Sequence, residues 1–172
     1  NQQSDAKHQS EENSLNELLH MLDRCKGITD SLQLNVPTGN EGYLQKPPFH
    51  LAAEKGQINA VTFLLDSKID IDSLDCKEAT ALHYANSTGI ARLLLERGAS
   101  SDLAQKDGWT PVHIASSKGL SEVVQLLIDF KADVNKPTTN GDYPLHLAVT
   151  SGDVNTVRVL LNSGADINSK DK

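Results

Sequence analysis

Short groups of apolar residues, separated by glycine-containing turns, recur along the chain from about residue 47 onward. Within each group the apolar side chains lie three or four positions apart, which is the spacing of one helix face. Proline favours the first turn of a helix at Pro48, and Gly56 predicts its end. The following helix is expected over 58–65, with an apolar face made of Val61, Phe63, Leu64 and Leu65. The pattern predicts a similar pair at 111–118 and 121–130, and another near the C-terminus.

The first part of the chain has a different pattern. Residues 1–13 contain almost nothing apolar and are expected to be a disordered leader. Ser14 and Glu17 then fit a capping box at a helix start, and leucines follow at helical spacing. Residues 14–41 are therefore predicted to be a helical cap that covers one end of the domain, since an end of a stacked array otherwise leaves an apolar face in water. The alternative is a helix that belongs to another domain.

One tetrapeptide recurs at the start of the predicted helix pairs. Its variants are Thr80-Ala-Leu-His83, Thr110-Pro-Val-His113 and Tyr143-Pro-Leu-His146, with Pro47-Pro-Phe-His50 as a degenerate fourth. The four histidines are 33, 30 and 33 residues apart by subtraction of their numbers. Self-similarity at a period of about 33 residues indicates a solenoid, in which each repeat packs only on its neighbours.

This repeated segment resembles the ankyrin-repeat family. The resemblance covers about residues 42–172 and is closest in the third repeat, around Asp107-Gly-Trp-Thr-Pro-Val-His113. It implies an all-α repeat fold, in which helix-turn-helix units stack and β-hairpin loops join them. The expected repeats are 42–74, 75–104, 105–137 and 138–170, followed by the start of a further repeat.

The second repeat is shorter than the others. The step from His83 to Ala99 is 16 residues, against 19 for the equivalent step in the third repeat. The three missing residues fall near 86–89, so the first helix of this repeat is expected to be little more than a turn. Ser87 or Thr88 is expected to cap the second helix, and the deletion is expected to leave a notch on the concave side.

The end of the chain keeps an apolar helix. Its apolar residues are Val154, Val157, Val159, Leu160 and Leu161. The segment 166–171 is similar to the opening of another hairpin. This end is expected to be the truncation of a longer array, and the alternative is a face that docks another molecule.

In ankyrin repeats the threonine hydroxyl and the histidine imidazole hydrogen-bond to the backbone of their own or the adjoining repeat. The resemblance gives this role to Thr80 and Thr110 and to His50, His83, His113 and His146. The role is expected to be weaker at Pro47 and Tyr143, which have no aliphatic hydroxyl at the threonine position. Helix starts leave unpaired amides, and a buried interface must satisfy them.

No motif indicates a metal or catalytic site. One histidine per repeat places neighbours a repeat apart, whereas shared zinc ligands lie at about 2 Å from the metal. The sequence has no Gly-x-Ser-x-Gly, His-Glu-x-x-His or phosphate-binding glycine loop. Aspartates at the hairpin approaches are expected to form local turns; they are Asp70, Asp72, Asp102, Asp133 and Asp166. The sequence therefore predicts no catalytic residue, no metal and no cofactor.

Composition narrows the classes of partner. The 172 residues carry a formal net charge of −7, which disfavours nucleic acid and an anionic membrane surface. No apolar run reaches the length of about 18 residues that crosses a bilayer. Cys25 and Cys76 lie far apart in sequence and are expected to be reduced thiols. We expect a monomer in the cytoplasm, with the nucleus as a second location.

The resemblance implies a protein or peptide partner on the concave surface, which combines the hairpin tips with the outer face of each first helix. The candidate contact residues are Tyr43, Leu44, Lys77, Lys106, Asp107, Trp109, Ser117, Lys118, Asn140, Asp142 and Thr150. Other positions expected on this surface are Lys46, Glu54, Lys55, Cys76, Ala79, Asn86, Ser87, Thr139 and Ser151. Trp109 is the favoured anchor because tryptophan is enriched among interface residues whose truncation costs about 2 kcal/mol or more. The alternative is that its ring only covers the neighbouring hairpin.

The expected function is therefore a protein-interaction module, either a scaffold or adaptor or the recognition domain of a larger protein. One alternative is a stand-alone inhibitor of an enzyme. The shortened second repeat is similar to that of the ankyrin-type inhibitors of cyclin-dependent kinases, although the leader and cap segments do not match that family. A further alternative is an array that targets an enzyme whose catalytic domain lies outside this chain.

Overall fold

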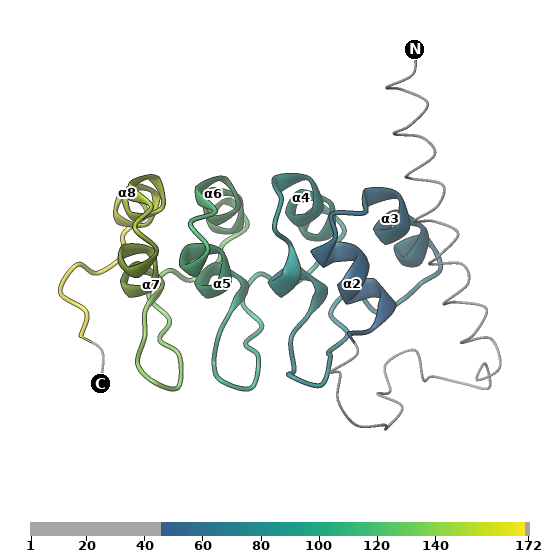
Figure 1. Cartoon of the computed structure of the whole chain (residues 1–172), viewed down its shortest axis with the longest axis horizontal. Helices are drawn as coiled ribbons and strands as arrows, with labels where there is room; N and C mark the ends of the chain where they lie inside the picture. The colour runs from purple at the N-terminus through teal and green to yellow at the C-terminus, as the bar shows by residue number, and fades with distance from the viewer. Residues whose placement is uncertain (1–45, 171–172) are drawn as a thin grey trace, which may run out of the picture.

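The computed structural model describes residues 46–170. Four helix pairs follow one another along a single axis (Figure 1). The elements are α2 (Pro48–Glu54), α3 (Ile58–Asp66), the 3-10 helix η2 (Ala81–Tyr84), α4 (Thr88–Glu96), α5 (Pro111–Ser117), α6 (Ser121–Asp129), α7 (Pro144–Ser151) and α8 (Val154–Asn162). Residues 46–170 contain helices and turns but no strand. The all-α repeat architecture predicted from the sequence is confirmed.

The helices form two rows that run along the array (Figure 1). The second helices, α3, α4, α6 and α8, make one row, and α2, η2, α5 and α7 make the other. Long loops project from the row of first helices, each closed by a tight turn. The backbone contacts at the turns include Asp75 N to Ala79 O at 3.0 Å and Gln105 N to Trp109 O at 2.9 Å. We call the loop tips (75–79, 105–109 and 138–142) and the exposed sides of the first helices the hairpin/helix-one surface.

The core lies between the two helix rows and between consecutive repeats. Large side chains that are fully buried include Phe49, Ile90, Leu94, Leu127 and Leu160. Alanines lie on the buried sides of the first helices, where Ala52, Ala53, Ala115 and Ala148 are all buried. Small side chains let neighbouring helices pack tightly despite the modest hydrophobic fraction of the chain.

The prediction for the apolar face of α3 was wrong at one position. Phe63 is 51% exposed, because the buried stripe of this helix consists of Ala60, Val61 and Leu64. Leu65 packs partly buried against the core. The phenyl ring of Phe63 therefore projects from the helix instead of joining the contact with α2.

The shortened second repeat is built as the sequence predicted. Its first helix is a single 3-10 turn of 4 residues, Ala81–Tyr84. Ser87 caps α4, where its hydroxyl accepts the amide of Ile90 at 3.4 Å. The second helix keeps its full length, so the deletion falls entirely within the first helix and the connection after it.

Residues with positive φ end the second helices. Gly98 and Gly164 have φ of 95° and 86°, and each amide bonds a carbonyl in the last helical turn. Lys68 and Lys131 occupy the equivalent places after α3 and α6, with φ of 62° and 73°. A side chain with a Cβ is strained in this left-handed region, so two of the four repeats carry a conformational cost at this point.

The aspartates at the hairpin approaches occupy two positions, which are two residues apart in the sequence. Their carboxylates accept different backbone amides. Asp70, Asp133 and Asp166 accept the amide two residues further on and form the local turns that were predicted. Asp72 and Asp102 do not fit that prediction. Their carboxylates accept backbone amides of the next repeat, Ser100 N at 3.1 Å and Asp133 N at 2.9 Å.

Asn135 takes the same place in the third repeat as Asp72 and Asp102 do in theirs. Its Oδ1 accepts the amide of Asp166 at 2.9 Å, and its Nδ2 donates to the carbonyl of Gly164 at 2.9 Å. The sequence spacing could not reveal this class of contact, since the partner amide lies about 30 residues away. Side chains at this position therefore join each repeat to the one that follows.

Several predictions fall outside residues 46–170, namely the leader at 1–13, the cap at 14–41, Cys25, Tyr43 and Leu44. At the other end of the array, apolar side chains remain exposed. They include Val149 at 62%, Val154 at 67% and Ile167 at 70%. The expected apolar end of the last repeat is thus present among the described residues.

Candidate functional site

Threonine and histidine together hold the start of the first helix in the second and third repeats. The hydroxyl and the amide of Thr80 both meet Nδ1 of His83, at 3.0 and 3.1 Å. Thr110 makes the same two contacts with His113, at 2.7 and 3.1 Å. Histidine takes the part that glutamate plays in an ordinary capping box.

In His50, His83 and His146 the other ring nitrogen, Nε2, contacts a backbone carbonyl in or next to the following hairpin, whereas Nε2 of His113 has no hydrogen-bond partner. Nε2 of His83 contacts the carbonyl of Trp109 at 3.0 Å, and Nε2 of His50 contacts the carbonyls of Ser73 and Ala79 at 3.0 and 2.9 Å. Nε2 of His146 lies 3.1 Å from the carbonyl of Ser169. The backbone role that the resemblance implied for these histidines is confirmed.

The expected weakening at Pro47 and Tyr143 is also observed. Proline has no amide hydrogen, so Nδ1 of His50 is buried without a hydrogen-bond partner. The amide of Tyr143 reaches Nδ1 of His146 only at 3.4 Å. Nδ1 of the histidine therefore makes both of its contacts only in the repeats whose tetrapeptide begins with threonine.

Burial keeps the imidazoles of His83 and His113 neutral. It lowers the pKa of His83 to about 4, against the opposing effect of the Trp109 carbonyl. Burial likewise lowers the pKa of His113 to about 4. The carbonyls of Lys136 and Asp142 favour the charged form of His113, but neither reaches hydrogen-bond geometry with its Nε2. Burial therefore decides the protonation state of this ring.

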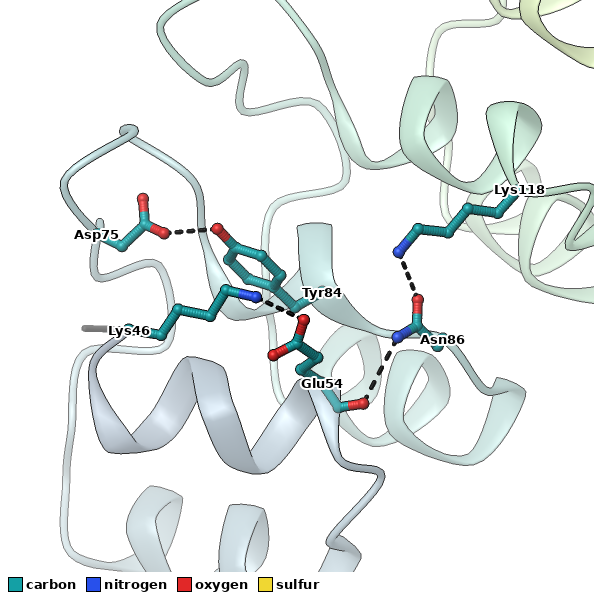
Figure 2. Close-up of polar contacts among 6 residues, drawn as sticks. All are labelled: Lys46, Glu54, Asp75, Tyr84, Asn86 and Lys118. Atoms are coloured by element: carbon teal, nitrogen blue, oxygen red, sulfur yellow. Dashed lines mark hydrogen bonds and ion pairs between the residues drawn. The ribbon is translucent and has the colours of Figure 1, made fainter. Parts of the chain in front are cut away.

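A group of polar side chains lies where α2, the following hairpin and η2 meet (Figure 2). Lys46, just before α2, forms an ion pair with Glu54 at the end of α2. The same ammonium lies 4.0 Å from the centre of the Tyr84 ring. The Tyr84 hydroxyl donates to Oδ2 of Asp75 at 2.7 Å. We call Lys46, Glu54, Asp75 and Tyr84 the Tyr84 cluster.

Asp75 is the anionic centre of this cluster. Its side chain accepts the amides of Lys77 and Ala79 at 2.8 and 2.9 Å, besides the Tyr84 hydroxyl. Burial by itself would raise the pKa of Asp75, but the hydrogen bonds from Tyr84, Ala79 and Lys77 outweigh it and lower the pKa. Burial and then the Asp75 contact raise the pKa of Tyr84. A carboxylate facing a neutral phenol is thus fixed at neutral pH.

Asn86 extends this group across three repeats (Figure 2). Its Nδ2 contacts the carbonyl of Glu54 at 3.5 Å, in the first repeat. Its Oδ1 accepts from Nζ of Lys118 at 2.7 Å, in the third repeat. The amide side chain therefore spans the site of the deletion, where the other repeats have a further helical turn.

Most of the predicted contact residues lie on the hairpin/helix-one surface and are accessible. The exposed ones are Lys77, Lys106, Asp107, Lys118, Asn140 and Thr150, and the half-buried ones are Trp109, Ser117 and Asp142. Ala79 was expected on this surface and is instead fully buried. Its amide donates to Asp75 and its carbonyl contacts Nε2 of His50, so Ala79 has a structural role.

Trp109 is held by its backbone and by a neighbouring ring. Its carbonyl accepts from His83 and from the amide of Gln105. Its indole lies 6.2 Å from the ring of His113, at an interplanar angle of 50°. The half-buried indole thus covers part of its own repeat and presents the remaining surface to solvent.

Tyr84 and Asp75 were not among the residues proposed from sequence. Tyr84 directly follows the histidine of its tetrapeptide, at a position where the other repeats have Leu51, Ile114 and Leu147. A tyrosine among aliphatic residues was a detectable signal. Its partner was not detectable, because the Asp75 contact depends on the fold of the hairpin.

The described part of the chain contains no group of three or more His, Cys, Asp or Glu side chains that could hold a metal ion. Cys76 is an exposed free thiol at a hairpin tip. Among residues 46–170, no helix has the length and apolar character needed to cross a membrane.

The stacked helix pairs, the histidine contacts and the hairpins define a class of repeat protein, and comparison identifies the family. A family model for ankyrin repeats, in three copies, matches residues 8–104 and 86–171. The chain belongs to the ankyrin-repeat family. The match begins at residue 8, within the segment predicted to be a leader and cap. Ankyrin repeats are generally protein–protein interaction modules, and the family is typically non-catalytic.

Several curated proteins are similar to this chain. Transient receptor potential cation channel subfamily A member 1 of Homo sapiens is 33% identical over 108 residues, which is 59% of this chain and 10% of that protein. Synphilin-1 of Mus musculus is 30% identical over 134 residues, covering 69% and 14%. Protein phosphatase 1 regulatory subunit 27 of Mus musculus is 34% identical over 74 residues, covering 41% and 48%. The chain spans less than half the length of each of these relatives.

Proposed function

We propose that this array is a non-catalytic recognition module that binds a partner protein or peptide on its hairpin/helix-one surface. The module acts as a monomeric scaffold or adaptor, or as the recognition domain of a larger protein. Its membership of the ankyrin-repeat family supports the general role in protein–protein interaction. The choice of surface is our own inference from the side chains described above.

The main support for this surface is that its buried and its exposed side chains have different roles. The buried threonines and histidines are used to hold the repeats together, as Thr110 and His113 do. The ends of Lys106, Asp107 and Asn140 instead stand exposed at successive hairpin tips. An exposed polar row beside a half-buried aromatic side chain is the composition of an interface that anchors a partner.

Trp109 is the proposed anchor, with Lys106 at the hairpin tip and Lys118 at the end of α5 as charged contacts in the same repeat. A tryptophan supplies a large apolar area with little loss of side-chain freedom. The hairpin of Trp109 is fixed by the bond from Lys106 N to the carbonyl of Lys77 at 3.0 Å. A partner would therefore meet an indole held in place before binding, which reduces the entropic cost of association.

The experiment is affinity capture with quantitative binding of any captured protein. Parent chain, Trp109→Ala, and a Lys106→Glu/Lys118→Glu double variant are compared after circular dichroism shows that each folds. We expect the alanine variant to weaken binding by tenfold or more, on the order of 2 kcal/mol. The charge reversal should act mainly on the association rate, and its effect should shrink in high salt.

Matched variants on the other helix row provide the controls. Phe130→Ala removes another partly exposed aromatic side chain, which is 37% exposed after α6. Arg92→Glu/Arg158→Glu makes the same change of net charge on α4 and α8, where both arginines are exposed. Binding that survives Trp109→Ala but is lost with Phe130→Ala would place the partner on the row of second helices and refute the proposal.

A second candidate function is regulation of an enzyme by direct binding. The observation that favours it is the similarity to protein phosphatase 1 regulatory subunit 27, whose name describes a subunit that regulates a phosphatase. If the captured partner is an enzyme, its activity should change on addition of the parent chain and remain unchanged with Trp109→Ala. A partner that binds with no change in activity would favour the scaffold over the regulator.

A further inference from the structure

The Tyr84 cluster holds an ammonium group in a defined setting. Nζ of Lys46 lies 4.0 Å from the centre of the Tyr84 ring and pairs with the carboxylate of Glu54 (Figure 2). A cation within about 6 Å of an aromatic centre is attracted by the negative face of the ring. The carboxylate supplies the second attraction, so the position of Nζ is defined from two directions.

The surroundings strengthen the attraction of the ring. The Tyr84 hydroxyl donates to Asp75, which is 9% exposed and is bonded to the amides of Lys77 and Ala79. Donation to a carboxylate shifts electron density toward the ring, and the backbone bonds hold that carboxylate in place. The hairpin therefore holds the Tyr84 ring in place whether or not an ammonium group is bound.

The three parts of the site come from different segments. Lys46 precedes α2, whereas Glu54 ends α2 and Tyr84 ends η2. The Lys46 and Glu54 side chains are 27% and 33% exposed, so solvent and solutes reach the ammonium. The Tyr84 side chain is itself half-buried, so part of it also faces solvent. An ammonium from another molecule could thus approach the same position.

We infer that Glu54 and Tyr84 form a subsite for a lysine side chain of the partner, and that Lys46 occupies this subsite within the chain until the partner's lysine replaces it. The inference rests on the proposed function, because it specifies the chemistry of a partner on the hairpin/helix-one surface. The formal net charge of −7 favours a basic partner. Lys46 then acts as an internal competitor that weakens binding of partners without a suitably placed lysine.

The test uses a minimal probe and the whole chain. The probe is an acetylated, amidated Gly-Lys-Gly peptide, and its control is the norleucine peptide of the same shape without the charge. Binding is followed by the NMR shifts of the Tyr84 ring protons and of the lysine side-chain protons of the peptide, and the peptide signals serve for the variant that lacks Tyr84. We expect Lys46→Ala to bind the lysine peptide about fivefold more tightly than the parent chain, given the modest strength of partly exposed ion pairs and cation–π contacts.

Two controls separate this effect from a general change of charge. Lys55→Ala removes another exposed lysine beside α2, with the same change in net charge, and should leave the affinity unchanged. Lys46→Ala/Glu54→Gln should lose the gain, because the ammonium then has no carboxylate partner. Lys46→Ala/Tyr84→Leu should lose it as well, and the Glu54 variant keeps the test valid if the Tyr84 variant does not fold.

The inference is overturned if the lysine and norleucine peptides shift the Tyr84 ring equally, if Lys46→Ala gives no gain over Lys55→Ala, or if Glu54→Gln leaves the gain intact. None of these results touches the proposed function, which is tested at Trp109 with a captured partner. Conversely, loss of the Trp109 effect would leave the peptide result standing as a property of the Tyr84 cluster alone.

Discussion

The amide of Thr80 donates to Nδ1 of His83 at 3.1 Å. This contact requires an unprotonated Nδ1, so the ring proton must be carried by Nε2. Nε2 then donates to the carbonyl of Trp109 at 3.0 Å. The fold thus selects one neutral tautomer, and a second ring proton would remove the acceptor that the Thr80 amide needs.

Acidification from about pH 7 to pH 4 should therefore destabilise the array. In the unfolded chain a histidine binds a proton near pKa 6.5, whereas His83 and His113 do so near pKa 4. The unfolded state binds more protons in between, so stability is fully present above about pH 6.5 and is lost as pH falls toward 4. Each histidine contributes on the order of 3 kcal/mol to this loss.

Urea unfolding at about pH 7, 5.5 and 4.5 would measure this loss, and NMR titration of the imidazole protons would assign it to individual histidines. The two rings should remain neutral in the folded state through most of this range. A folded-state titration of His83 near pH 6.5, or a free energy of unfolding that does not change between pH 7 and 4.5, would contradict the prediction.

Leu94→Ala should uncouple the two halves of the array. Leu94 on α4 is fully buried, and truncation of a buried leucine costs about 2–5 kcal/mol. Repeats interact only with their neighbours, so protection against hydrogen exchange should fall most in the first two repeats and their junction with α6. Leu161→Ala, at a leucine that is 37% exposed, is the control. Equal loss of protection throughout the array would rule out this mechanism.

Tyr84→Phe should destabilise the array by about 1.5–3 kcal/mol at neutral pH, the usual effect of removing a hydrogen bond to a charged group. The pKa of Asp75 should rise, because its hydrogen bond from Tyr84 opposes the effect of burial. A lowered carboxyl pKa stabilises the fold above its unfolded pKa of 3.8 and loses that effect as pH falls. The variant should therefore lose less stability on acidification below pH 4.

Tyr143→Phe removes the same atom from the fourth repeat and is the matched control for this change. Denaturant unfolding gives the stability, and carbon-detected NMR of the carboxyl groups gives the Asp75 pKa. An unchanged Asp75 pKa in Tyr84→Phe would mean that the backbone amides alone determine it.

Lys131→Gly should stabilise the array by about 0.5–1 kcal/mol. Lys131 has a φ of 73° after α6, and relief of left-handed strain outweighs the extra freedom that glycine gives the unfolded chain. Gly164→Ala is the reciprocal test after α8, where an added Cβ would meet no atom within 4 Å, so only backbone strain should act. Thermal melting that moves both variants in the same direction would refute the argument.

The sequence predicted the repeats well because their signals are local. Pro48 and Pro111 predicted helix starts that the structure confirms, and the count of residues after His83 predicted the single turn at Ala81–Tyr84. The histidine roles were carried by the family resemblance, and the missing hydroxyl at Pro47 predicted that His50 would be less well held, although the structure shows that the missing amide of Pro47 matters as well.

Contacts between repeats were much harder to predict. Phe63 has an apolar side chain at a plausible helical position, but the choice of the buried stripe depends on where α2 lies. The carboxylate of Asp72 reaches Ser100, 28 positions away, and no local pattern distinguishes it from Asp70. The Tyr84 cluster combines Lys46 before α2 and Glu54 at the end of α2 with two residues of the next repeat, Asp75 and Tyr84, so its geometry could be recognised only in three dimensions.

The contacts from Asp72 to Ser100, from Asp102 to Asp133 and from Asn135 to Asp166 all run in one direction. In every case the earlier repeat gives the side-chain oxygen and the later one gives the backbone amide. These contacts therefore have one direction along the array. A substitution at one of these positions affects the following repeat, not the repeat that carries it. Substituting Asp102 by alanine would leave the amide unpaired in the third repeat, while the second repeat that carries the substitution would keep its own amide bonded to Asp72.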